Sequence, residues 1–282
     1  ILACSMSATL MCGDKFLDLS SPVIMGVLNV TPDSFSDGGR YLHVDAALRQ
    51  AELMLREGAV IIDIGAESTR PNANPVSEQQ ELDRLLPVIE RIKQQLDVIV
   101  SIDTSTPVVI AEAACRGAGI INDVRALQRD GALMAAAATG LPICLMHMQG
   151  QPNTMQQQPH YLSVVDEVKV FLQQRIDTCL AVGIRREQLL LDVGFGFGKT
   201  LSHNLELLRR LAEFETFHLP LLVGMSRKSM LGTILGGATV DERLYAGVAA
   251  ATIAVMNGAN IVRTHDVRAT KDAIAVVSAM KF

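Results

Sequence analysis

The sequence has no excess of basic residues. It contains 25 lysines and arginines against 30 aspartates and glutamates, and its formal net charge at pH 7 is −5. A protein that binds duplex nucleic acid usually presents a basic surface, because its partner is a polyanion. The acidic balance therefore argues against nucleic acid as a partner, while it leaves room for a local basic pocket that binds a small anion.

The cysteines lack the spacing of a zinc or redox site. There are five, widely separated along the chain, and no two of them form a CxxC pair. Zinc sites and redox dithiols usually place two cysteines close together in sequence. We therefore expect free thiols in the reducing environment of the cytoplasm.

The sequence also lacks an apolar run long enough to cross a membrane. A membrane-spanning helix needs about 18 or more consecutive apolar residues, and charged or turn residues interrupt every hydrophobic stretch of this chain. No lysine or arginine precedes Lys15, so the basic start of a secretory signal is missing. We expect no membrane association, and we expect residues 1–16 to be an N-terminal extension whose part before Met6 is a candidate vector-derived segment.

Short β-branched runs alternate with longer segments of helical periodicity, which is typical of βα units around a parallel sheet. Strands are expected over 23–28, 59–64, 98–102, 119–121, 142–146, 189–191, 221–224 and 260–262, with helices such as 45–57, 78–95, 162–181 and 242–257 between them. No linker or low-complexity tract divides the chain. We predict an α/β fold, a single (β/α)8 TIM barrel over residues 17–282, with long mobile βα loops at its C-terminal face.

Glycines support this assignment. Each of five glycines falls between a helical segment and a strand, at Gly58, Gly117, Gly140, Gly183 and Gly258. Helices often end at a residue in the left-handed conformation, which glycine adopts without a steric penalty. The repeated position is expected of the turn that leads from each helix into the next strand.

Polar residues follow every predicted strand. They are Asn29, Asp63 with Glu67, Asp103, Asn122 with Asp123, His147, Asp192, Ser226 with Lys228, and Arg263 with His265. The carboxyl ends of barrel strands converge on one face, where the active sites of this architecture lie. A strand that simply runs into a polar loop explains any single position, but eight together indicate a functional site.

Three glycine-containing loops accompany these polar residues. The loop over 29–39 has the length and composition of a mobile lid, although an ordinary surface Ω-loop explains it equally well. The loop over 65–77 offers Thr69 and Arg70 as donors to an anion. The loop over 190–199 lacks the glycine spacings of nucleotide-binding motifs, and its two phenylalanines suit the cover of a flat ligand.

The sequence contains no Ser-His-Asp arrangement and no HExxH or HxH zinc motif. Basic residues instead follow the seventh and eighth strands, where barrel enzymes often bind a phosphate. Amides and carboxylates such as Asp103 and Asn122 suit a heterocycle rich in N–H donors and ring nitrogens. The pattern favours a reaction in which a diphosphate leaves, because such chemistry needs positioning and charge stabilisation more than a protein nucleophile.

With these motifs in view, the sequence resembles the dihydropteroate synthase family from Pro22 to about Ala279. The matching stretches, in the family's order and spacing, are GVLNVTPDSFSDGG, ESTRP, SIDTS, INDVR, CLMHMQG, LDVGFGFGK, LLVGMSRKSMLG and VRTHDV. The resemblance implies a sulfonamide-target transferase of folate biosynthesis. It would condense 6-hydroxymethyl-7,8-dihydropterin diphosphate with p-aminobenzoate to give 7,8-dihydropteroate and diphosphate.

The resemblance also implies roles for individual residues. Binding of the pterin and its diphosphate falls to Thr69, Asp103, Asn122, Met146, Asp192, Lys228, Arg263 and His265. Binding of p-aminobenzoate falls to Phe35, Thr69, Arg70, Pro71, Phe197, Ser226 and Lys228. The catalytic set is Lys228, Arg263, His265, Asp33 and Arg70, and Asn29 matches the magnesium ligand. Mg²⁺ is therefore the implied cofactor and a homodimer the implied assembly.

In the family, closure of the first two loops organises the p-aminobenzoate site. The diphosphate departs first and leaves a cation that the pterin stabilises, and the amine of p-aminobenzoate then attacks. Two other interpretations remain open from the sequence. A methyltetrahydrofolate methyltransferase that serves a corrinoid protein would share the pterin carboxylates without needing Arg263 and His265, and a catalytically silent pterin-binding protein would not need intact basic clusters.

Two positions depart from the family's common pattern. A second glycine is usual where this chain has Ala66, and if that position requires a positive φ, the added Cβ costs about 1 kcal/mol. A proline is usual where this chain has Val193, which frees φ and adds an N–H donor. Neither change removes a matched functional side chain, so we expect activity to be retained.

Overall fold

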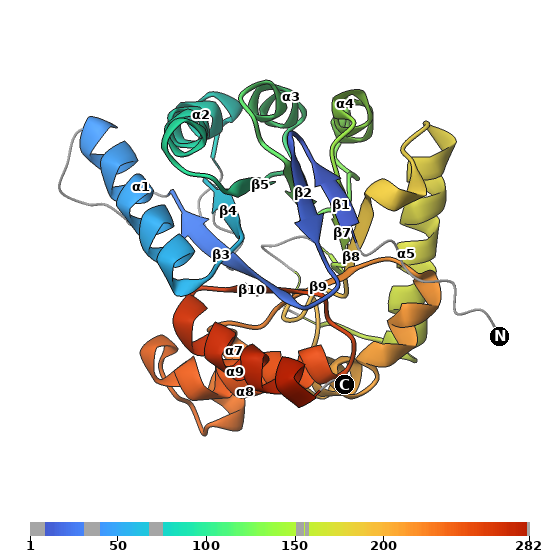
Figure 1. Ribbon diagram of the computed structural model, residues 1–282. Coiled ribbons are helices and arrows are strands. Elements are labelled where there is room, and N and C mark those ends of the chain that lie inside the picture. Colours follow the sequence, from blue (N-terminus) through green and yellow to red (C-terminus); the bar gives the residue numbers. More distant parts are fainter. Residues whose placement is uncertain (1–8, 31–39, 68–75, 151–154, 156–157, 281–282) are drawn as a thin grey trace.

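The computed structural model describes residues 9–30, 40–67, 76–150, 155 and 158–280 of the chain (Figure 1). Eight parallel strands close into a barrel in the order β10-β3-β4-β5-β6-β7-β8-β9. They are β3 (Val23–Asn29), β4 (Ile61–Gly65), β5 (Ile99–Asp103), β6 (Ile120–Asp123), β7 (Ile143–Met146), β8 (Leu189–Asp192), β9 (Leu221–Gly224) and β10 (Ile261–Thr264). The predicted (β/α)8 barrel and all eight of its predicted strands are confirmed, with ends that move by one or two residues.

Helices surround the barrel and alternate with its strands. They are α1 (Arg40–Glu57), α2 (Glu78–Gln95), α3 (Pro107–Cys115), α4 (Ala132–Thr139), α5 (Val164–Ala181), α6 (Leu201–Arg209), α7 (Ser229–Ile234), α8 (Leu244–Met256) and α9 (Val267–Met280). Short 3-10 turns lie at η2 (Arg186–Gln188), η3 (Leu211–Phe217) and η4 (Val240–Arg243). None of the helices in the described parts of the chain combines the length and apolarity needed to span a bilayer.

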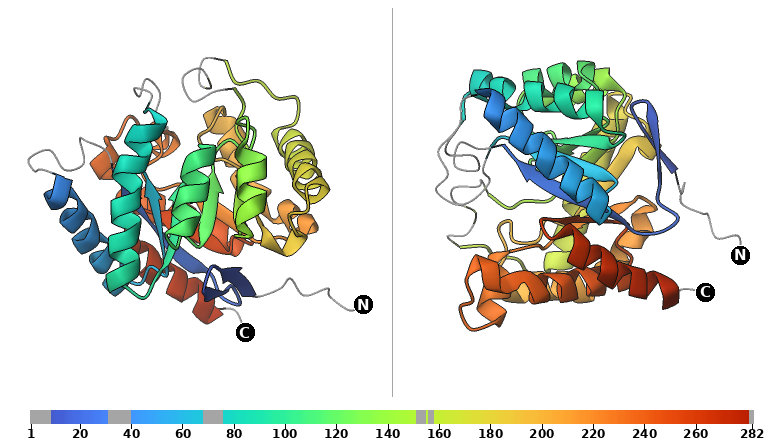
Figure 2. Two further views of the ribbon diagram at one scale, coloured as in Figure 1. Left: turned by 90° about the horizontal axis from the view of Figure 1, so that it is seen from above. Right: turned by 60° about the vertical axis from the view of Figure 1, so that its left-hand side comes forward.

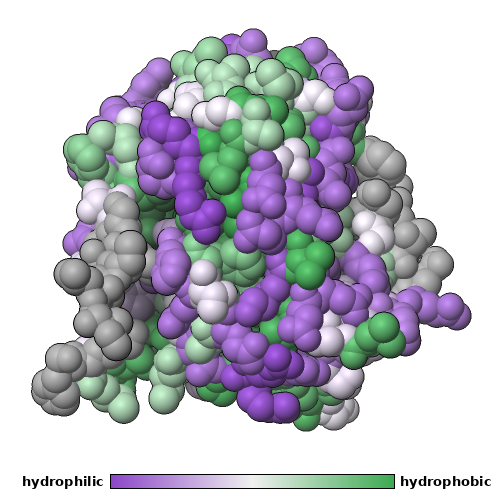
Figure 3. Space-filling view, turned by 90° about the vertical axis from the view of Figure 1, so that its right-hand side faces the viewer, coloured by the Kyte–Doolittle hydropathy of each residue, from purple (hydrophilic) through white to green (hydrophobic). Residues whose placement is uncertain are grey.

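Helix α2 shows why the helices take their places. Ser77 and Gln80 form a capping box at its start, which satisfies backbone N–H groups that the first turn leaves free. Leu85, Val88 and Ile92 are spaced for one helical face and are buried against the barrel. The outward faces of the helices are polar by the same pattern. Figure 3 shows this on the side of the molecule that carries α5, where hydrophilic side chains cover most of the surface and apolar side chains form separate patches.

A two-stranded hairpin covers the amino-terminal end of the barrel. It consists of β1 (Thr9–Cys12) and β2 (Lys15–Asp18), which pair antiparallel, and Figure 2 shows it at the same end as the last turn of α9. Its apolar side chains pack against inward residues of the strands in one buried layer: Leu10, Cys12, Leu17, Leu19, Met25, Ile61, Ile99, Ile120, Cys144, Leu190, Leu222 and Ile261. The sequence did not predict this hairpin, which crosses the boundary expected after residue 16.

The predicted helix-ending glycines all have positive φ. The angles of Gly58, Gly117, Gly140, Gly183 and Gly258 lie between 68° and 108°, so the left-handed helix ends are confirmed. Ala66 does not belong to the described residues with positive φ, and its methyl group is fully buried in the core. The strain considered for this departure from the family pattern therefore does not arise.

Candidate active site

The carboxyl ends of the strands bring the predicted side chains to one mouth of the barrel. Asn29, Asp103, Met146 and Asp192 are the last residues of their strands. Asn122 and Arg263 lie one residue before a strand end, and the loops that follow carry Phe197, Ser226, Lys228 and His265. The predicted residues Asp33, Phe35, Thr69, Arg70 and Pro71 lie outside the described part of the chain.

Arg263 occupies the centre of this mouth between two carboxylates. Its Nε lies 2.6 Å from Oδ2 of Asp63, and one terminal nitrogen lies 2.9 Å from Oδ2 of Asp103. Burial opposes the charge of the guanidinium, but the two carboxylates more than compensate and hold its pKa above the usual value. Arg263 is therefore a fixed cation at the mouth.

Asp63, one of the polar residues at the strand ends, contacts two of the predicted site residues. Its side chain is fully buried, and its Oδ2 also accepts a hydrogen bond from Nδ2 of Asn122 at 3.1 Å. It thus holds two predicted pterin-binding side chains in place. A carboxylate in the middle of the apolar strand sequence IIDIG was the signal that pointed to it.

The two acidic groups of the predicted pterin site are harder to ionise than exposed carboxyls. Burial raises the pKa of Asp103 to about 7, although the positive charge of Arg263 opposes the rise. Burial also raises the pKa of Asp192, against hydrogen bonding from the N–H of Gly194 and the charge of Lys228. Such groups can adjust their protonation when a ligand presents donors or acceptors to them.

Lys228 supplies a second positive charge close to these carboxyls. Its Nζ lies 4.1 Å from the ring centroid of Phe197, within the range of a cation–π contact. Burial, followed by the charge of Arg263, lowers the pKa of Lys228 to about 8, while Asp192 and Asp103 oppose the shift. Phe197 and Lys228 therefore form one wall of the mouth together.

A buried lysine organises the glycine-rich loop that carries Phe197. Nζ of Lys199 donates to the carbonyl oxygens of Gly194 at 2.9 Å and Phe197 at 3.0 Å, and it lies 2.9 Å from Nδ1 of His147. Burial, and then the charge of Lys199, lowers the pKa of His147 to about 2, so this ring is neutral. The lysine that ends the motif LDVGFGFGK was visible in the sequence, but its contacts were not.

The glycine at position 194 is required by the close approach of two chain segments. A Cβ at Gly194, whose φ is +70°, would lie only 1.9 Å from the carbonyl oxygen of His147. The Gly194 N–H also donates to Oδ1 of Asp192 at 2.7 Å. The loop therefore fixes the carboxyl of Asp192 through this hydrogen bond. Val193, which stands where the family usually has proline, is buried in the core beside Asp192.

The loops after β9 and β10 are joined through polar side chains. Oγ of Ser226 lies 3.1 Å from Nδ1 of His265 and accepts from the backbone N–H of His265 at 3.2 Å. Arg227 pairs with Asp266 at 2.7 Å in the same loops. The arrangement holds Ser226 and His265 side by side in the loops after β9 and β10, where the sequence predicted an anion site.

The side chain of Asn29 is exposed at the mouth. The described residues contain no group of three histidine, cysteine or carboxylate side chains that could hold a metal ion. A hard cation such as Mg²⁺ often takes only one or two protein ligands and completes its shell with water and substrate phosphates. The single amide oxygen of Asn29 fits that pattern and does not fit an all-protein metal site.

A cavity of about 380 Å³ lies at the opposite end of the barrel. Its lining includes Leu19, Pro22, His218 and Asn260, which precede the strands or stand at their amino ends. It contains none of the converging charged side chains described above. The assignment of the active site therefore rests on the chemistry gathered at the carboxyl ends of the strands.

Comparison with known proteins gives a consistent result. Residues 25–265 match the sequence family described as "Pterin binding enzyme". The chain is 57% identical over 263 residues to the dihydropteroate synthase of Escherichia coli (strain K12), which covers 93% of both chains. A crystal structure of the Yersinia pestis dihydropteroate synthase with a sulfonamide drug is 54% identical with a TM-score of 0.92, covering 97% of this chain and 99% of that one. A Xanthomonas albilineans dihydropteroate synthase with 4-aminobenzoic acid is 44% identical with a TM-score of 0.92, covering 97% and 98%.

Proposed function

The chain belongs to the dihydropteroate synthase family of pterin-binding enzymes, and from that premise we propose how its barrel mouth performs the reaction. The enzyme condenses 6-hydroxymethyl-7,8-dihydropterin diphosphate with p-aminobenzoate and releases diphosphate. One observation supports these roles most strongly: Arg263 and Lys228 lie in the same mouth as three buried carboxyl groups, those of Asp63, Asp103 and Asp192. An anionic leaving group and a heterocycle with many hydrogen-bonding atoms both find complementary partners there.

The pterin ring binds to the buried polar groups. Asp103, Asn122 and Asp192 offer carboxyl and amide atoms that pair with the ring's N–H groups and nitrogens. Met146 packs with Val124, Met155 and Phe197 in a small apolar cluster next to these groups. A flat aromatic ring is therefore recognised by hydrogen bonds at its edge and by apolar contact at its face.

The diphosphate binds on the basic side of the mouth. Arg263 and His265 lie there, and Thr69 joins them by its place in the family motif. Asn29 would hold Mg²⁺, which when bound supplies positive charge to the diphosphate oxygens. Arg263 is well suited to bind the diphosphate for two reasons. The carboxylates of Asp63 and Asp103 keep its guanidinium charged, and they use only some of its five N–H donors.

The reaction proceeds without a protein nucleophile. The bond between the pterin methylene carbon and the diphosphate oxygen breaks, and the electron pair leaves with the diphosphate. The amine nitrogen of p-aminobenzoate then forms a bond to the methylene carbon and loses a proton. Arg263 and Lys228 stabilise the departing negative charge, while Phe197, Ser226 and Lys228, with Phe35, Thr69, Arg70 and Pro71, hold p-aminobenzoate.

The enzyme works as a homodimer in the cytoplasm. Support for the dimer comes from α8 and α9, which expose large apolar side chains such as Tyr245, Met256, Val276 and Met280 to an extent of 60% or more. Exposed apolar surface on neighbouring helices is common where a second subunit packs. The free state of the cysteines in the described residues agrees with a reducing compartment.

One assay tests the proposed function. The purified protein is supplied with the pterin diphosphate, p-aminobenzoate and Mg²⁺, and diphosphate release is measured. We expect release that requires all three. Release that proceeds at full rate without p-aminobenzoate or without Mg²⁺ would contradict the proposed roles.

A further inference from the structure

Arg227 lies in the loop after β9 in a backbone conformation that arginine rarely adopts. Its φ is +60°, in the left-handed region where a Cβ crowds the following carbonyl oxygen. The N–H of Lys228 donates to the carbonyl oxygen of Met225 at 3.3 Å, so residues 225–228 form a tight turn with Arg227 at its third position. Glycine is usual at that position when φ is positive. An arginine there indicates that its side chain is needed for a contact.

The contact of this side chain is an ion pair with Asp266 in the loop after β10. Nη2 of Arg227 lies 2.7 Å from Oδ1 of Asp266, and Nε lies 3.4 Å from Oδ2. Two donors that face two acceptors fix direction as well as distance. The carbonyl oxygen of Arg227 also accepts a hydrogen bond from Nη1 of Arg243 at 3.1 Å. The turn is therefore held through both the side chain and the backbone of its strained residue.

Asp266 is itself fixed at the start of α9. Its N–H donates to Oγ1 of Thr264 at 3.1 Å, and its carbonyl oxygen accepts from the N–H of Thr270 at 3.1 Å. An aspartate directly before a helix usually caps that helix with its side chain. Among the described residues, the hydrogen-bond partners of this carboxylate are instead Arg227 and Ser226, whose Oγ donates to it at 3.3 Å. Asp266 thus ties the loop after β9 to the start of α9.

Ser226 connects this ion pair to the predicted substrate contacts. The Oγ atom that donates to Asp266 also lies 3.1 Å from Nδ1 of His265. The same oxygen accepts from the backbone N–H of His265 at 3.2 Å. One hydroxyl therefore links the carboxylate to the imidazole ring that is expected to face the diphosphate. A displacement of Asp266 would move Ser226 and His265 together.

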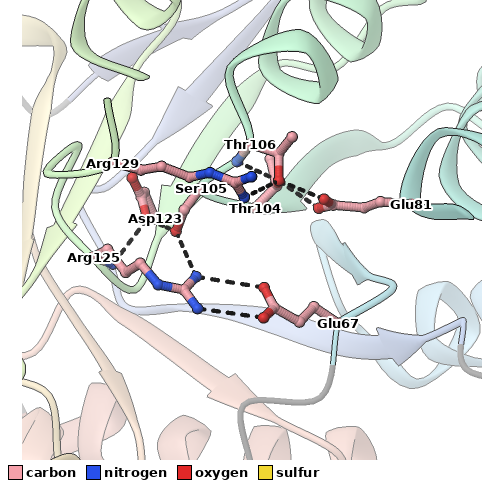
Figure 4. A network of polar contacts seen from close by, with 8 residues as sticks. All are labelled: Glu67, Glu81, Thr104, Ser105, Thr106, Asp123, Arg125 and Arg129. Atoms are coloured by element: carbon pink, nitrogen blue, oxygen red, sulfur yellow. Dashed lines mark hydrogen bonds and ion pairs between the residues drawn. The ribbon is translucent and has the colours of Figure 1, made fainter. Parts of the chain in front are cut away.

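A second polar network, shown in Figure 4, provides a comparison. Arg129 donates there to Oγ1 of Thr106 at 2.7 Å and pairs with Glu78 at 3.1 Å. Like the pair of Arg227 and Asp266, this pair joins segments that follow different strands. None of its residues belongs to the predicted substrate site, so it is a matched control for an ion pair whose role is structural.

We propose that Arg227 and Asp266 are positioning residues, which hold Ser226 toward p-aminobenzoate and His265 toward the diphosphate. This inference rests on the proposed function, in which Ser226 and His265 contact those groups. Arg227 and Asp266 act through these neighbours and do not touch the substrates. The pterin ring depends on carboxyl and amide groups at the ends of β5, β6 and β8, so its affinity should stay nearly unchanged when the ion pair is removed.

The test compares four variants of the complete enzyme. Asp266→Asn removes the charge of the pair at nearly constant size, and Glu78→Gln does the same in the comparison pair. Arg227→Gly removes the guanidinium together with the strain of the turn. His218→Gly relieves a similar positive φ, 51°, at the opposite end of the barrel. We expect the KM for p-aminobenzoate to rise about three- to tenfold in Asp266→Asn and Arg227→Gly and to stay within about twofold in the two controls.

Melting temperature separates a positioning role from a structural one. The ion pair is partly exposed, with 39% of the side chain of Arg227 and 21% of that of Asp266 accessible, so it contributes little to stability. Glycine adopts a positive φ without a steric penalty. Arg227→Gly should therefore melt close to the unaltered enzyme while its KM rises. If Arg227→Gly fails to fold, Arg227→Lys takes its place, because it keeps the charge and loses the second donor.

Ligand affinities complete the test. The affinity for inorganic diphosphate in the presence of Mg²⁺ should fall in Asp266→Asn and Arg227→Gly, and the affinity for a pterin without diphosphate should not. An unchanged KM for p-aminobenzoate in either variant, or a pterin affinity that falls as much as the KM rises, would overturn the positioning role. Failure of the proposed function would look different: the unaltered enzyme itself would show no release of diphosphate that depends on p-aminobenzoate.

Discussion

Replacing Asp63 with asparagine tests the charge at the centre of the barrel mouth without changing the size of the side chain. Oδ2 of Asp63 lies 2.6 Å from Nε of Arg263 and 3.1 Å from Nδ2 of Asn122. The amide oxygen of an asparagine can accept both hydrogen bonds. Its NH2 group then takes the place of Oδ1, which is buried and has no hydrogen-bond partner among the described residues.

The magnitude follows from these contacts. A hydrogen bond to a charged group contributes about 1.5–3 kcal/mol and a neutral one about 0.5–1.5 kcal/mol, and a buried donor without an acceptor costs about 1–3 kcal/mol. Arg263 keeps its second partner, Asp103, at 2.9 Å, so the loss stays below the roughly 3–5 kcal/mol of a fully broken buried pair. We expect the free energy of unfolding to fall by about 2–3 kcal/mol, which lowers the melting temperature by about 4–10 °C.

Two measurements check this prediction. Thermal unfolding gives the stability, and calorimetric titration with a pterin gives the affinity, which we expect to fall about tenfold, or about 1.4 kcal/mol. Asp97→Asn is the matched control, because Asp97 pairs with Lys15 at the surface with 93% of its side chain exposed, and its removal should cost less than about 0.5 kcal/mol. If Asp63→Asn melts and binds pterin like Asp97→Asn, the reasoning that Asp63 anchors Arg263 is refuted.

The remaining predictions concern the lysines, one carboxyl and the glycine-rich loop. Lys228→Ala should weaken pterin binding by about 1.5–3 kcal/mol with little change in melting temperature, and equal affinities in calorimetry would contradict this. Asp103→Asn should leave the barrel folded and weaken pterin binding, because a donor replaces an acceptor; a large loss of stability at unchanged affinity would indicate a structural role instead. Gly194→Ala should lower both pterin affinity and melting temperature, because the added Cβ would meet the carbonyl oxygen of His147. Gly140→Ala is the control: an added Cβ there has open space, so the substitution should cost only about 1 kcal/mol of backbone strain. Burial lowers the pKa of Lys199 from 10.5 to about 7. Between pH 7 and pH 10.5 the unfolded chain therefore binds more protons at this lysine than the folded chain does. The free energy of unfolding should rise with pH across that window, by up to about 1.4 kcal/mol per pH unit. Lys199→Met should show a smaller rise in urea titrations across the same window, with only the contribution of Lys228 left above about pH 8. Parallel curves for the two proteins would refute the prediction.

The sequence predicted the barrel because its signals are local. Each strand is a short apolar run, and each helix-ending glycine lies at a fixed place between a helix and a strand. The hairpin over Thr9–Asp18 was missed for the opposite reason. Its strands have four residues each, and the surface that they cover exists only after the barrel has closed.

The composition of the active site was predictable in part. Polar residues at strand ends and the resemblance to a known family placed Asp103, Asn122, Asp192, Lys228 and Arg263 in one mouth. The partners of these side chains were not predictable, because Arg263 and Asp63 are 200 residues apart in the chain and meet only through the register of the closed barrel. The same holds for the contacts of Lys199. The roles of Asp33, Phe35, Thr69, Arg70 and Pro71 stay predictions, since they lie outside the described residues.

A crystal structure of the enzyme with its pterin diphosphate and Mg²⁺ tests the central claim most directly. We expect the edge of the pterin ring to make hydrogen bonds to Asp103, Asn122 and Asp192, with Lys228 beside it. We expect the diphosphate to contact Arg263 and His265, and Mg²⁺ to bind the side-chain oxygen of Asn29. A pterin ring bound away from these three groups, or a diphosphate that contacts neither Arg263 nor His265, would contradict the assignment of the barrel mouth.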